Sequence, residues 1–247
     1  MAPAKGRLIP METFLSVVVP AYNEEKRLGA SLISIVDFLK KQPYSWEVIV
    51  ADDGSTDATV SVAREKLSGY PHQILTTTHN QGKGNAVKRG MLAAEGLFRL
   101  FTDADLSTPI EETDLFLEKL KAGSDVVIGS RALAGSKVLV HQNLVRESMG
   151  RIFNAFAKFF AFHDIEDSQC GFKAFTAKAA DDLFKLQKLP GFSFDVEIVF
   201  LAQRRGYRLL EVPVTWRNSE QSRVRLLSDP LLMFWDLLKI RWIHRND

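Results

Sequence analysis

Short apolar segments that end in polar loops recur along the first half of the chain, and this pattern constrains the fold more than any other feature. Segments 14–19 and 46–51 are apolar, β-branched runs, as is typical of strands buried on both faces of a parallel sheet. Segments 73–77 and 97–102 are expected to form a third, short strand and a fourth. The residues between them repeat apolar side chains at helical spacing. Alternating strands and helices predict an α/β fold with a mostly parallel central sheet flanked by helices.

The second half of the chain continues the alternation with less regular spacing. We expect helices over 109–121, 146–162, 194–202 and 230–245, a helix ending near Leu186, and strands over 125–131, 171–175 and 207–215. Pro213 argues for an edge position or a strand end, because proline cannot donate to a strand ladder. Segment 132–149 contains Gly135 and Ser136 and predicts a mobile loop. We divide the chain into a leader over 1–13, one domain over 14–228 and a C-terminal amphipathic helix over 229–247.

Composition excludes several classes of protein. The 247 residues contain 46% hydrophobic side chains, which is enough for a full core. With 32 basic and 30 acidic residues the net charge is +2, so the overall balance predicts no nucleic-acid partner. Cys170 is the only cysteine, which excludes an internal disulfide. No apolar run reaches the roughly 18 residues of a membrane span, and residues 1–10 lack a signal-peptide core, so we expect a cytoplasmic protein.

Two aspartates stand two positions apart at the end of the fourth predicted strand. Asp103 and Asp105 follow segment 97–102, and Pro109 prevents the strand from simply continuing. A loop at this point lets both carboxylates turn toward one ligand. Mg²⁺ and Mn²⁺ take one or two carboxylates and complete their shells with phosphate and water, so the pair predicts a divalent metal bound to phosphate. The simpler alternative is a pair of aspartates that cap the next segment or lie solvated in a turn.

The loops after the other predicted strands bring further polar residues to the same edge of the sheet. Right-handed crossovers place every strand-to-helix loop on one edge of a parallel sheet, and ligands of open α/β sheets bind there. The polar residues in these loops are Asn23, Glu24, Asp52, Asp53, Lys83 and Arg131. Together with the aspartate pair they predict a site for a charged, phosphate-containing ligand.

Two predicted helices are rich in aromatic residues. The helix over 146–162 carries four phenylalanines at helical spacing, Phe153, Phe156, Phe159 and Phe160, which predicts either core packing or a lipid-facing groove. The helix over 230–245 mixes aromatic and basic residues, Trp235, Trp242, Lys239, Arg241 and Arg245. This composition is typical of a helix at a membrane surface, and the alternative is a helix docked on its own domain.

Four motifs, in this order and spacing, resemble those of the family 2 inverting glycosyltransferases. They are Val17-Val-Val-Pro-Ala-Tyr-Asn-Glu-Glu25, Val48-Ile-Val-Ala-Asp-Asp-Gly-Ser-Thr-Asp57, Asp103-Ala-Asp105 and Gly129-Ser-Arg131. Three others, at 80–85, 167–173 and 194–197, resemble the polyprenyl-phosphate branch, which includes dolichyl-phosphate glucosyltransferases and dolichyl-phosphate mannose synthases. The resemblance covers roughly residues 14–216. It implies a GT-A, Rossmann-like fold and a nucleotide-sugar donor, UDP-glucose or GDP-mannose.

The resemblance implies donor-binding roles for residues at the predicted edge, and their chemistry fits such a ligand. Pro20, Ala21 and Tyr22 would form a wall beside the base. Asp53 would accept a hydrogen bond from the ring N–H of the base, and Glu24 would contact the nucleoside. Asp103 and Asp105 would hold Mg²⁺ or Mn²⁺. This cation would offset the charge of the leaving diphosphate, with help from Lys83 and Arg131.

The predicted site has no clear catalytic base, and this agrees with a lipid phosphate as the acceptor. None of the five histidines lies in a strong catalytic context, and a phosphate monoester, with a second pKa of about 6, can attack without an enzymic base. It needs cations instead. The resemblance assigns this role to Arg146, with Arg131 shared between the two phosphates and with Arg151 and Lys173 as further candidates. Ser107 stands where mannose synthases often carry a glutamine that binds the metal. This difference argues against a metal ligand at position 107 and against mannose as the transferred sugar.

The sequence thus predicts a metal-dependent inverting glycosyltransferase that moves glucose from UDP-glucose to a dolichyl or polyprenyl phosphate at the cytoplasmic face of a membrane. The expected catalytic residues are Asp103, Asp105, Arg131 and Arg146. One alternative transfers mannose, and another uses a saccharide or other soluble acceptor with Asp164, Asp167 or Asp195 as base. A third is a regulatory subunit that binds a nucleotide sugar without catalysis. A membrane protein partner or a second copy of the chain is compatible with each.

Overall fold

The computed structural model describes residues 12–140, 156, 163–217 and 229–247. In this part of the chain the central sheet has seven strands, β1 (Leu15–Ala21), β2 (Trp46–Asp52), β3 (His72–Leu75), β4 (Phe98–Thr102), β5 (Val126–Ser130), β7 (Phe172–Thr176) and β8 (Leu209–Pro213). Their order is β3-β2-β1-β4-β7-β5-β8. Neighbouring strands are parallel except at β7, which is antiparallel to both β4 and β5. The predicted mostly parallel sheet is confirmed.

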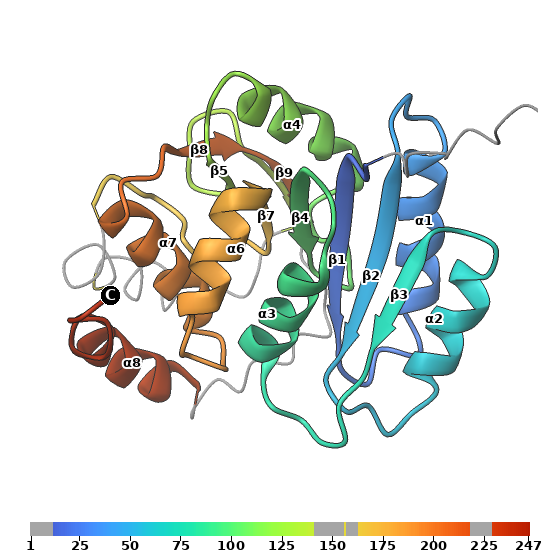
Figure 1. Ribbon diagram of the computed structural model, residues 1–247, viewed down its shortest axis with the longest axis horizontal. Helices are drawn as coiled ribbons and strands as arrows, with labels where there is room; N and C mark the ends of the chain where they lie inside the picture. The colour runs from blue at the N-terminus through green and yellow to red at the C-terminus, as the bar shows by residue number, and fades with distance from the viewer. Residues whose placement is uncertain (1–11, 141–155, 157–162, 218–228) are drawn as a thin grey trace, which may run out of the picture.

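Helices cover both faces of this sheet (Figure 1). One face packs against α1 (Leu28–Leu39), α2 (Thr59–Leu67) and α4 (Thr113–Lys121), which follows the short 3₁₀ helix Ile110–Glu112. The other face packs against α3 (Lys83–Ala93), α6 (Ala177–Leu186), α7 (Phe194–Arg204) and α8 (Asp229–Ile243). Side chains alternate between the two cores along β1, since Val17 and Val19 lie in the first and Val18 in the second. The uninterrupted apolar runs are therefore explained by burial on both faces.

The carboxyl ends of β1, β2 and β3 meet at one edge of the sheet, the lower edge in Figure 1. The loops after β1 and β2 are bonded to one another there. Asn23 N–H donates to Ser55 Oγ at 2.8 Å, and Thr56 N–H donates to Asn23 Oδ1 at 2.8 Å. Ser55 and Thr56 thus join two loops and do not cap α2. The carboxylate of Asp57 accepts the Thr59 N–H at 2.9 Å instead.

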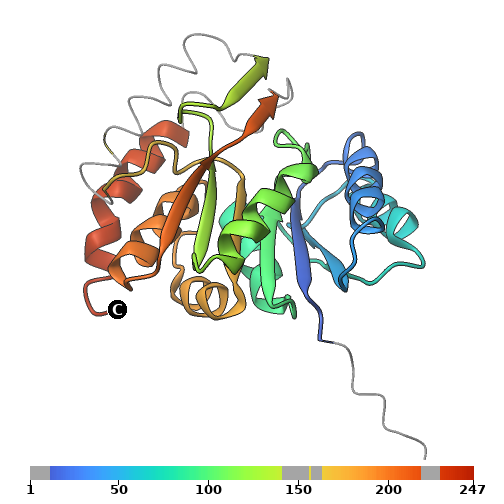
Figure 2. The ribbon, with the colours of Figure 1, turned by 90° about the horizontal axis from the view of Figure 1, so that it is seen from above.

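Two strands lie outside the central sheet. β6 (Lys137–Val140) pairs in parallel with β9 (Thr215–Arg217), and Figure 2 shows this pair at one side of the molecule. The loop prediction for 132–149 is therefore wrong over Lys137–Val140, because backbone groups there bond to a strand far along the chain. The predicted strand over 207–215 divides into β8 and β9, and Pro213 ends the edge strand β8 as expected.

The C-terminal helix α8 is docked on its own domain and also presents aromatic residues to solvent. Leu237 and Ile240 are 1% and 0% exposed and belong to the core over α3, α6 and α7. Trp235 and Trp242, on the opposite side, are 59% and 66% exposed. Apolar residues therefore lie on both the core side and the solvent side of α8. None of the helices in the described ranges has the length and apolar character that crossing a bilayer requires.

The phenylalanine-rich helix over 146–162 lies outside the described residues except for Phe156. The Phe156 ring is 42% exposed and meets the ring of Phe234 on α8 edge-on, with 5.3 Å between centroids. Both alternatives for this helix, core packing and a lipid-facing groove, stay predictions.

Candidate functional site

Asp103 and Asp105 lie in the loop after β4, at the edge of the sheet that the loops after β1 and β2 share. Their side chains are 33% and 19% exposed, so a ligand can reach them. Asp103 Oδ1 lies 2.6 Å from Lys83 Nζ, and Asp105 Oδ2 lies 3.7 Å from Arg27 Nη1. The Ser107 N–H donates to Asp105 Oδ1 at 3.0 Å. Cations from two other loops therefore compensate the charge of the carboxylate pair.

Gly171 leaves room for the Asp103 carboxylate. A Cβ at this glycine would stand 2.0 Å from Asp103 Oδ2, and the Asp103 N–H donates to the Gly171 carbonyl at 3.2 Å. Within the described ranges, no group of three or more His, Cys, Asp or Glu side chains could hold a metal ion. The carboxylates of Asp103 and Asp105 are the kind of ligand that Mg²⁺ and Mn²⁺ take one or two at a time, with phosphate and water completing the shell.

Lys83 is the first residue of α3, and the preceding loop holds it at the site. Gly82 has a φ of 102°, a backbone conformation that favours glycine. Burial lowers the pKa of the Lys83 ammonium, but the carboxylates of Asp103 and Asp195 outweigh it and raise the pKa above its ordinary value. Lys83 therefore stays protonated and supplies a fixed positive charge beside Asp103.

Asp53 fixes the loop before α3, and its predicted contact with the nucleotide base stays a prediction. Its two oxygens accept N–H bonds from Gln81 at 3.0 Å and from Gly82 at 2.7 Å, and the residue is 2% exposed. Burial raises the pKa of the Asp53 carboxyl, although these two bonds oppose the shift. Its neighbour Asp52 is also 2% exposed, and its Oδ1 has no hydrogen-bond partner in the described part of the chain. Asp52, which the sequence already placed at this edge of the sheet, is therefore a further candidate acceptor.

Arg27 is a residue of the site that sequence reasoning missed. It pairs through two nitrogens with both oxygens of Glu24, a residue that is 6% exposed. The hydrogen bond to Glu24 is the main cause that raises the pKa of the Arg27 guanidinium, and Asp105 and Asp103 add to it. The only sequence signal was the i, i+3 spacing of Glu24 and Arg27. Glu24 thus holds the arginine that faces the carboxylate pair, and its predicted contact to the nucleoside stays a prediction.

Pro20, Ala21 and Tyr22 lie at the carboxyl end of β1, beside the loops just described. β1 extends through Ala21, one residue beyond Pro20, where we expected the strand to end. Pro20 and Ala21 are buried and Tyr22 is partly exposed, so Tyr22 is the member of this predicted wall that a ligand reaches most easily.

Arg131 follows β5 and makes a bidentate pair with Asp167. Arg131 Nε lies 2.6 Å from Asp167 Oδ2, and Nη2 lies 2.9 Å from Oδ1. Burial alone would raise the pKa of the Asp167 carboxyl, but the charge and hydrogen bonds of Arg131 outweigh it and hold the pKa below its usual range. The guanidinium also lies 5.4 Å from the centre of the Trp216 ring. Asp103 contributes to the raised pKa of Arg131, so this arginine lies within the electrostatic reach of the carboxylate pair.

The Arg131–Asp167 pair predicts a pH dependence of stability. Its contribution should be fully present above the ordinary aspartate pKa of about 4 and be lost as the pH falls through the lower pKa of the folded state. We therefore expect the gap in unfolding free energy between the wild type and Asp167→Asn to be widest near neutral pH and to narrow toward about pH 3. Urea unfolding across this range measures it. A gap that does not change with pH would contradict the assignment.

Lys173 does not face the predicted phosphate site. It is 0% exposed, donates from Nζ to the Cys170 carbonyl at 2.7 Å, and pairs with the Asp195 carboxylate. Burial raises the pKa of the Asp195 carboxyl although Lys173 and Lys83 oppose the shift. The geometry therefore gives Lys173 a role in the core beneath the site and does not support the expected contact with the acceptor phosphate. Arg146 and Arg151, the other acceptor candidates, lie outside the described residues, so their roles stay predictions.

Cys170 is a free, buried cysteine. Burial raises the pKa of its thiol to about 11. The thiol is therefore protonated near neutral pH.

Comparison with known protein families gives a match over most of the chain. The family described as "Glycosyl transferase family 2" matches residues 16–184. Solved structures with the same fold include glucosyl-3-phosphoglycerate synthase from Mycobacterium tuberculosis in complex with Mn²⁺, UDP and glucosyl-3-phosphoglycerate. Its TM-score is 0.65 at 22% identity over 92% of this chain and 78% of that one. Such a likeness supports the GT-A fold and nothing finer.

Several curated proteins match over nearly the whole chain. A dolichyl-phosphate β-glucosyltransferase of Trichomonas vaginalis is 35% identical over 245 residues, which are 95% of this chain and 75% of that protein. Those of Saccharomyces cerevisiae and Homo sapiens are each 34% identical, cover 93% and 92% of this chain, and are themselves covered to 75% and 74%.

Proposed function

Since the chain belongs to glycosyl transferase family 2, we propose that it transfers glucose from UDP-glucose to the phosphate of a dolichyl or other polyprenyl phosphate. The observation that carries the proposal is the carboxylate pair Asp103 and Asp105, with Lys83 and Arg27 beside it, at the edge of the sheet where nucleotide ligands bind. The identity to dolichyl-phosphate β-glucosyltransferases supports the sugar and the acceptor. Solved relatives of this fold contain UDP with Mn²⁺ or Mg²⁺, which supports the donor class.

The donor side of the site is built to hold a diphosphate. Asp103 and Asp105 would hold Mg²⁺ or Mn²⁺, and the bound cation would offset the negative charge that develops on the leaving diphosphate. Lys83 adds a protonated ammonium at a fixed place, because Asp53 and the first turn of α3 hold its backbone. Arg131 adds a guanidinium whose plane is set by Asp167. These cations bind and orient the diphosphate before the sugar leaves.

The acceptor side favours a phosphate over a sugar hydroxyl. A hydroxyl acceptor would need a base, and the predicted bases were Asp164, Asp167 and Asp195. In the structure Asp167 and Asp195 are buried and paired with Arg131 and Lys173, so neither carboxylate is placed to accept a proton from a sugar hydroxyl. Asp164 is exposed. A lipid phosphate is already ionised near neutral pH, which supports an acceptor that needs no base.

The outer side of α8 supports a reaction at a membrane surface. Trp235, Leu238 and Trp242 recur at helical spacing and are 59%, 39% and 66% exposed. The exposed basic residues of the same helix end are Lys239, Arg241 and Arg245. Tryptophan with basic residues suits the boundary between headgroups and acyl chains of an anionic bilayer, where a polyprenyl phosphate resides. We include attachment at the cytoplasmic face in the same proposal.

A transfer assay tests this function. Purified protein, Mn²⁺ or Mg²⁺, labelled UDP-glucose and a short polyprenyl phosphate should yield label that extracts into butanol, and EDTA should abolish this product until excess cation is restored. The matched control is the same polyprenol without its phosphate, which should accept no sugar. Lipid label from GDP-mannose alone would overturn the donor assignment. Transfer to the bare alcohol, or no lipid label with either donor, would overturn the acceptor assignment.

A further inference from the structure

A short segment between α6 and α7 forms a bridge between the donor site and the C-terminal helix. This segment, residues 187–190, packs against the first turn of α3, which begins with Lys83. The Gln187 side chain donates to the Gly84 carbonyl at 2.9 Å, and the Asn85 N–H donates to the Pro190 carbonyl at 3.1 Å. Lys88 Nζ also donates to the Gln187 carbonyl at 2.6 Å. A Cβ at Gly82 would stand 2.4 Å from the Pro190 oxygen, so segment 187–190 and the Lys83 turn fit together without spare room.

The carboxylate of Glu197 on α7 accepts hydrogen bonds from the backbone of this segment. Its Oε1 accepts the Lys188 N–H at 2.7 Å, and its Oε2 accepts the Leu189 N–H at 2.9 Å. The side chain is 0% exposed. Donor binding as described above uses no atom of Glu197, yet its carboxylate is the group that fixes the backbone against which the Lys83 turn rests.

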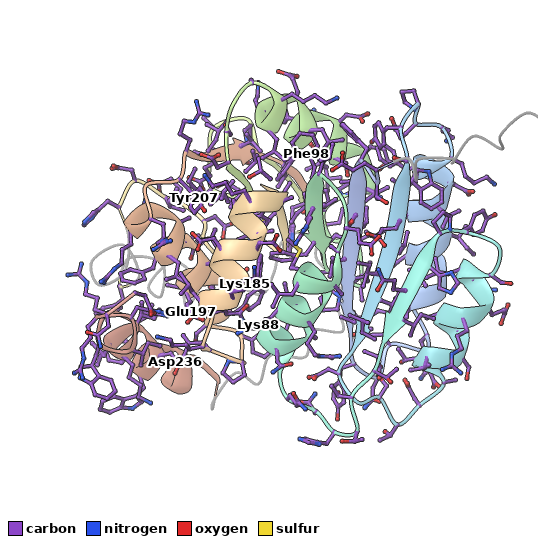
Figure 3. All side chains as sticks on the ribbon, in the orientation of Figure 1. Lys88, Phe98, Lys185, Glu197, Tyr207 and Asp236 are labelled. Carbon is purple, nitrogen blue, oxygen red and sulfur yellow. The ribbon has the colours of Figure 1, made fainter. Side chains whose placement is uncertain are left out.

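The same carboxylate is bonded to the end of α8. His244 Nε2 lies 2.6 Å from Glu197 Oε1, and both side chains are 0% exposed. Since a carboxylate only accepts, the imidazole donates in this bond. A second link joins the two helices where Ser193 Oγ donates to Asp236 Oδ2 at 2.7 Å. Figure 3 shows Lys88, Glu197 and Asp236 in the region where α3, α7 and α8 meet.

These contacts form one chain from α8 to the donor site, through His244, Glu197, segment 187–190 and the Lys83 turn. We propose that Glu197 is a positioning residue for donor binding, which makes the placement of Lys83 beside Asp103 depend on the seating of α8. The opposite side of α8 is the aromatic and basic surface assigned above to the membrane, so the two surfaces share one rigid helix. The inference rests on the proposed function, because it takes a nucleotide diphosphate as the ligand that Lys83 contacts.

Three variants of the full chain test the proposal, each titrated with UDP in the presence of Mn²⁺ by calorimetry. Glu197→Gln, which disturbs the bonds to Lys188 and Leu189, and His244→Ala, which removes the tie to α8, should each weaken UDP binding about tenfold. In the transfer assay they should raise KM for UDP-glucose and leave kcat at saturating donor nearly unchanged. Lys185→Met is the matched control: Lys185 lies on the exposed side of α6 in its last turn and stands outside the contacts described above, so the UDP affinity of this variant should equal that of the wild type.

The outcomes separate a positioning role from a structural one and from a failure of the proposed function. Lower thermal stability of Glu197→Gln with unchanged UDP affinity would overturn the inference and leave the function standing. No UDP binding by the wild type would overturn both. Hydrogen exchange of the wild type needs no variant: UDP with Mn²⁺ should slow exchange of the Lys188 and Leu189 amides and of the last turn of α8, because coupling is reciprocal. Exchange that slows only around Asp103 would also overturn it.

Discussion

Asp103→Asn is expected to lower the rate of glucosyl transfer about 1,000-fold, because the variant keeps the shape of the site and loses its central negative charge. Asparagine fits the space that Gly171 leaves, so the loop after β4 should keep its course. The amide cannot pair with Lys83 as the carboxylate does at 2.6 Å. It also removes one of the two anionic ligands of the expected cation.

Two measurements check this prediction. Initial rates give the loss of transfer, and titration with Mn²⁺ in the presence of UDP gives the loss of cation affinity without relying on turnover. Asp37→Asn is the matched control, because Asp37 lies on the exposed side of α1 and its replacement should change neither quantity. Transfer by Asp103→Asn within about tenfold of the wild type would exclude Asp103 as a metal ligand.

The order of strands and helices in the first half of the chain could be predicted because its signals are local. Each buried strand is a continuous apolar run, and each crossover repeats apolar residues at helical spacing, so β1, β2 and β4 and their loops follow from short windows of sequence. The position of β7 could not be predicted. Its five residues enter the sheet between β4 and β5 in antiparallel orientation, and such a choice depends on contacts between distant segments.

In the candidate site, too, features set by nearby residues could be predicted from sequence, and features set by contacts between distant segments could not. The convergence of Asp103 and Lys83 follows from parallel strands ending at one edge, and the structure brings their charged groups to 2.6 Å. The partners of Asp53 and Glu24 do not follow, because nothing in two acidic loop residues says that backbone N–H groups or Arg27 already occupy their oxygens. Charged residues in the loops at this edge of the sheet therefore identify the site from sequence. Which of them contact a ligand and which support the loops can be determined only from the folded structure.

Lys173 is the sharpest example, and it leads to the largest expected effect on stability. In the sequence it is a lysine near a motif of the family, which suggested a phosphate contact. In the structure it is a buried ammonium whose partners are the Asp195 carboxylate and the Cys170 carbonyl, with the ring centre of Phe101 5.3 Å away. A charge in this position keeps Asp195 compensated and in place beneath Lys83.

Lys173→Met is expected to lower the free energy of unfolding by about 3–5 kcal/mol, because it leaves the Asp195 carboxylate buried without its nearest cation. Methionine has a similar length, so the loss should come from the unpaired charge more than from a cavity. The double variant Lys173→Met/Asp195→Leu should recover most of the loss, since replacing a whole buried pair by apolar side chains is often neutral. Urea unfolding near neutral pH measures both values, with Lys178→Met on the exposed side of α6 as the control that should change little.

The pH dependence of Lys173→Met provides an independent check on the cause. Burial already raises the pKa of the Asp195 carboxyl in the wild type, and loss of the lysine should raise it further. A group with a raised pKa in the folded state binds its proton more tightly when folded, so its contribution to stability is present below the unfolded pKa and is lost as the pH rises through the folded pKa. The deficit of Lys173→Met relative to the wild type should therefore be largest near neutral pH and shrink on acidification. A deficit that is the same at every pH, or a double variant no more stable than the single one, would show that packing and not the buried charge accounts for the loss.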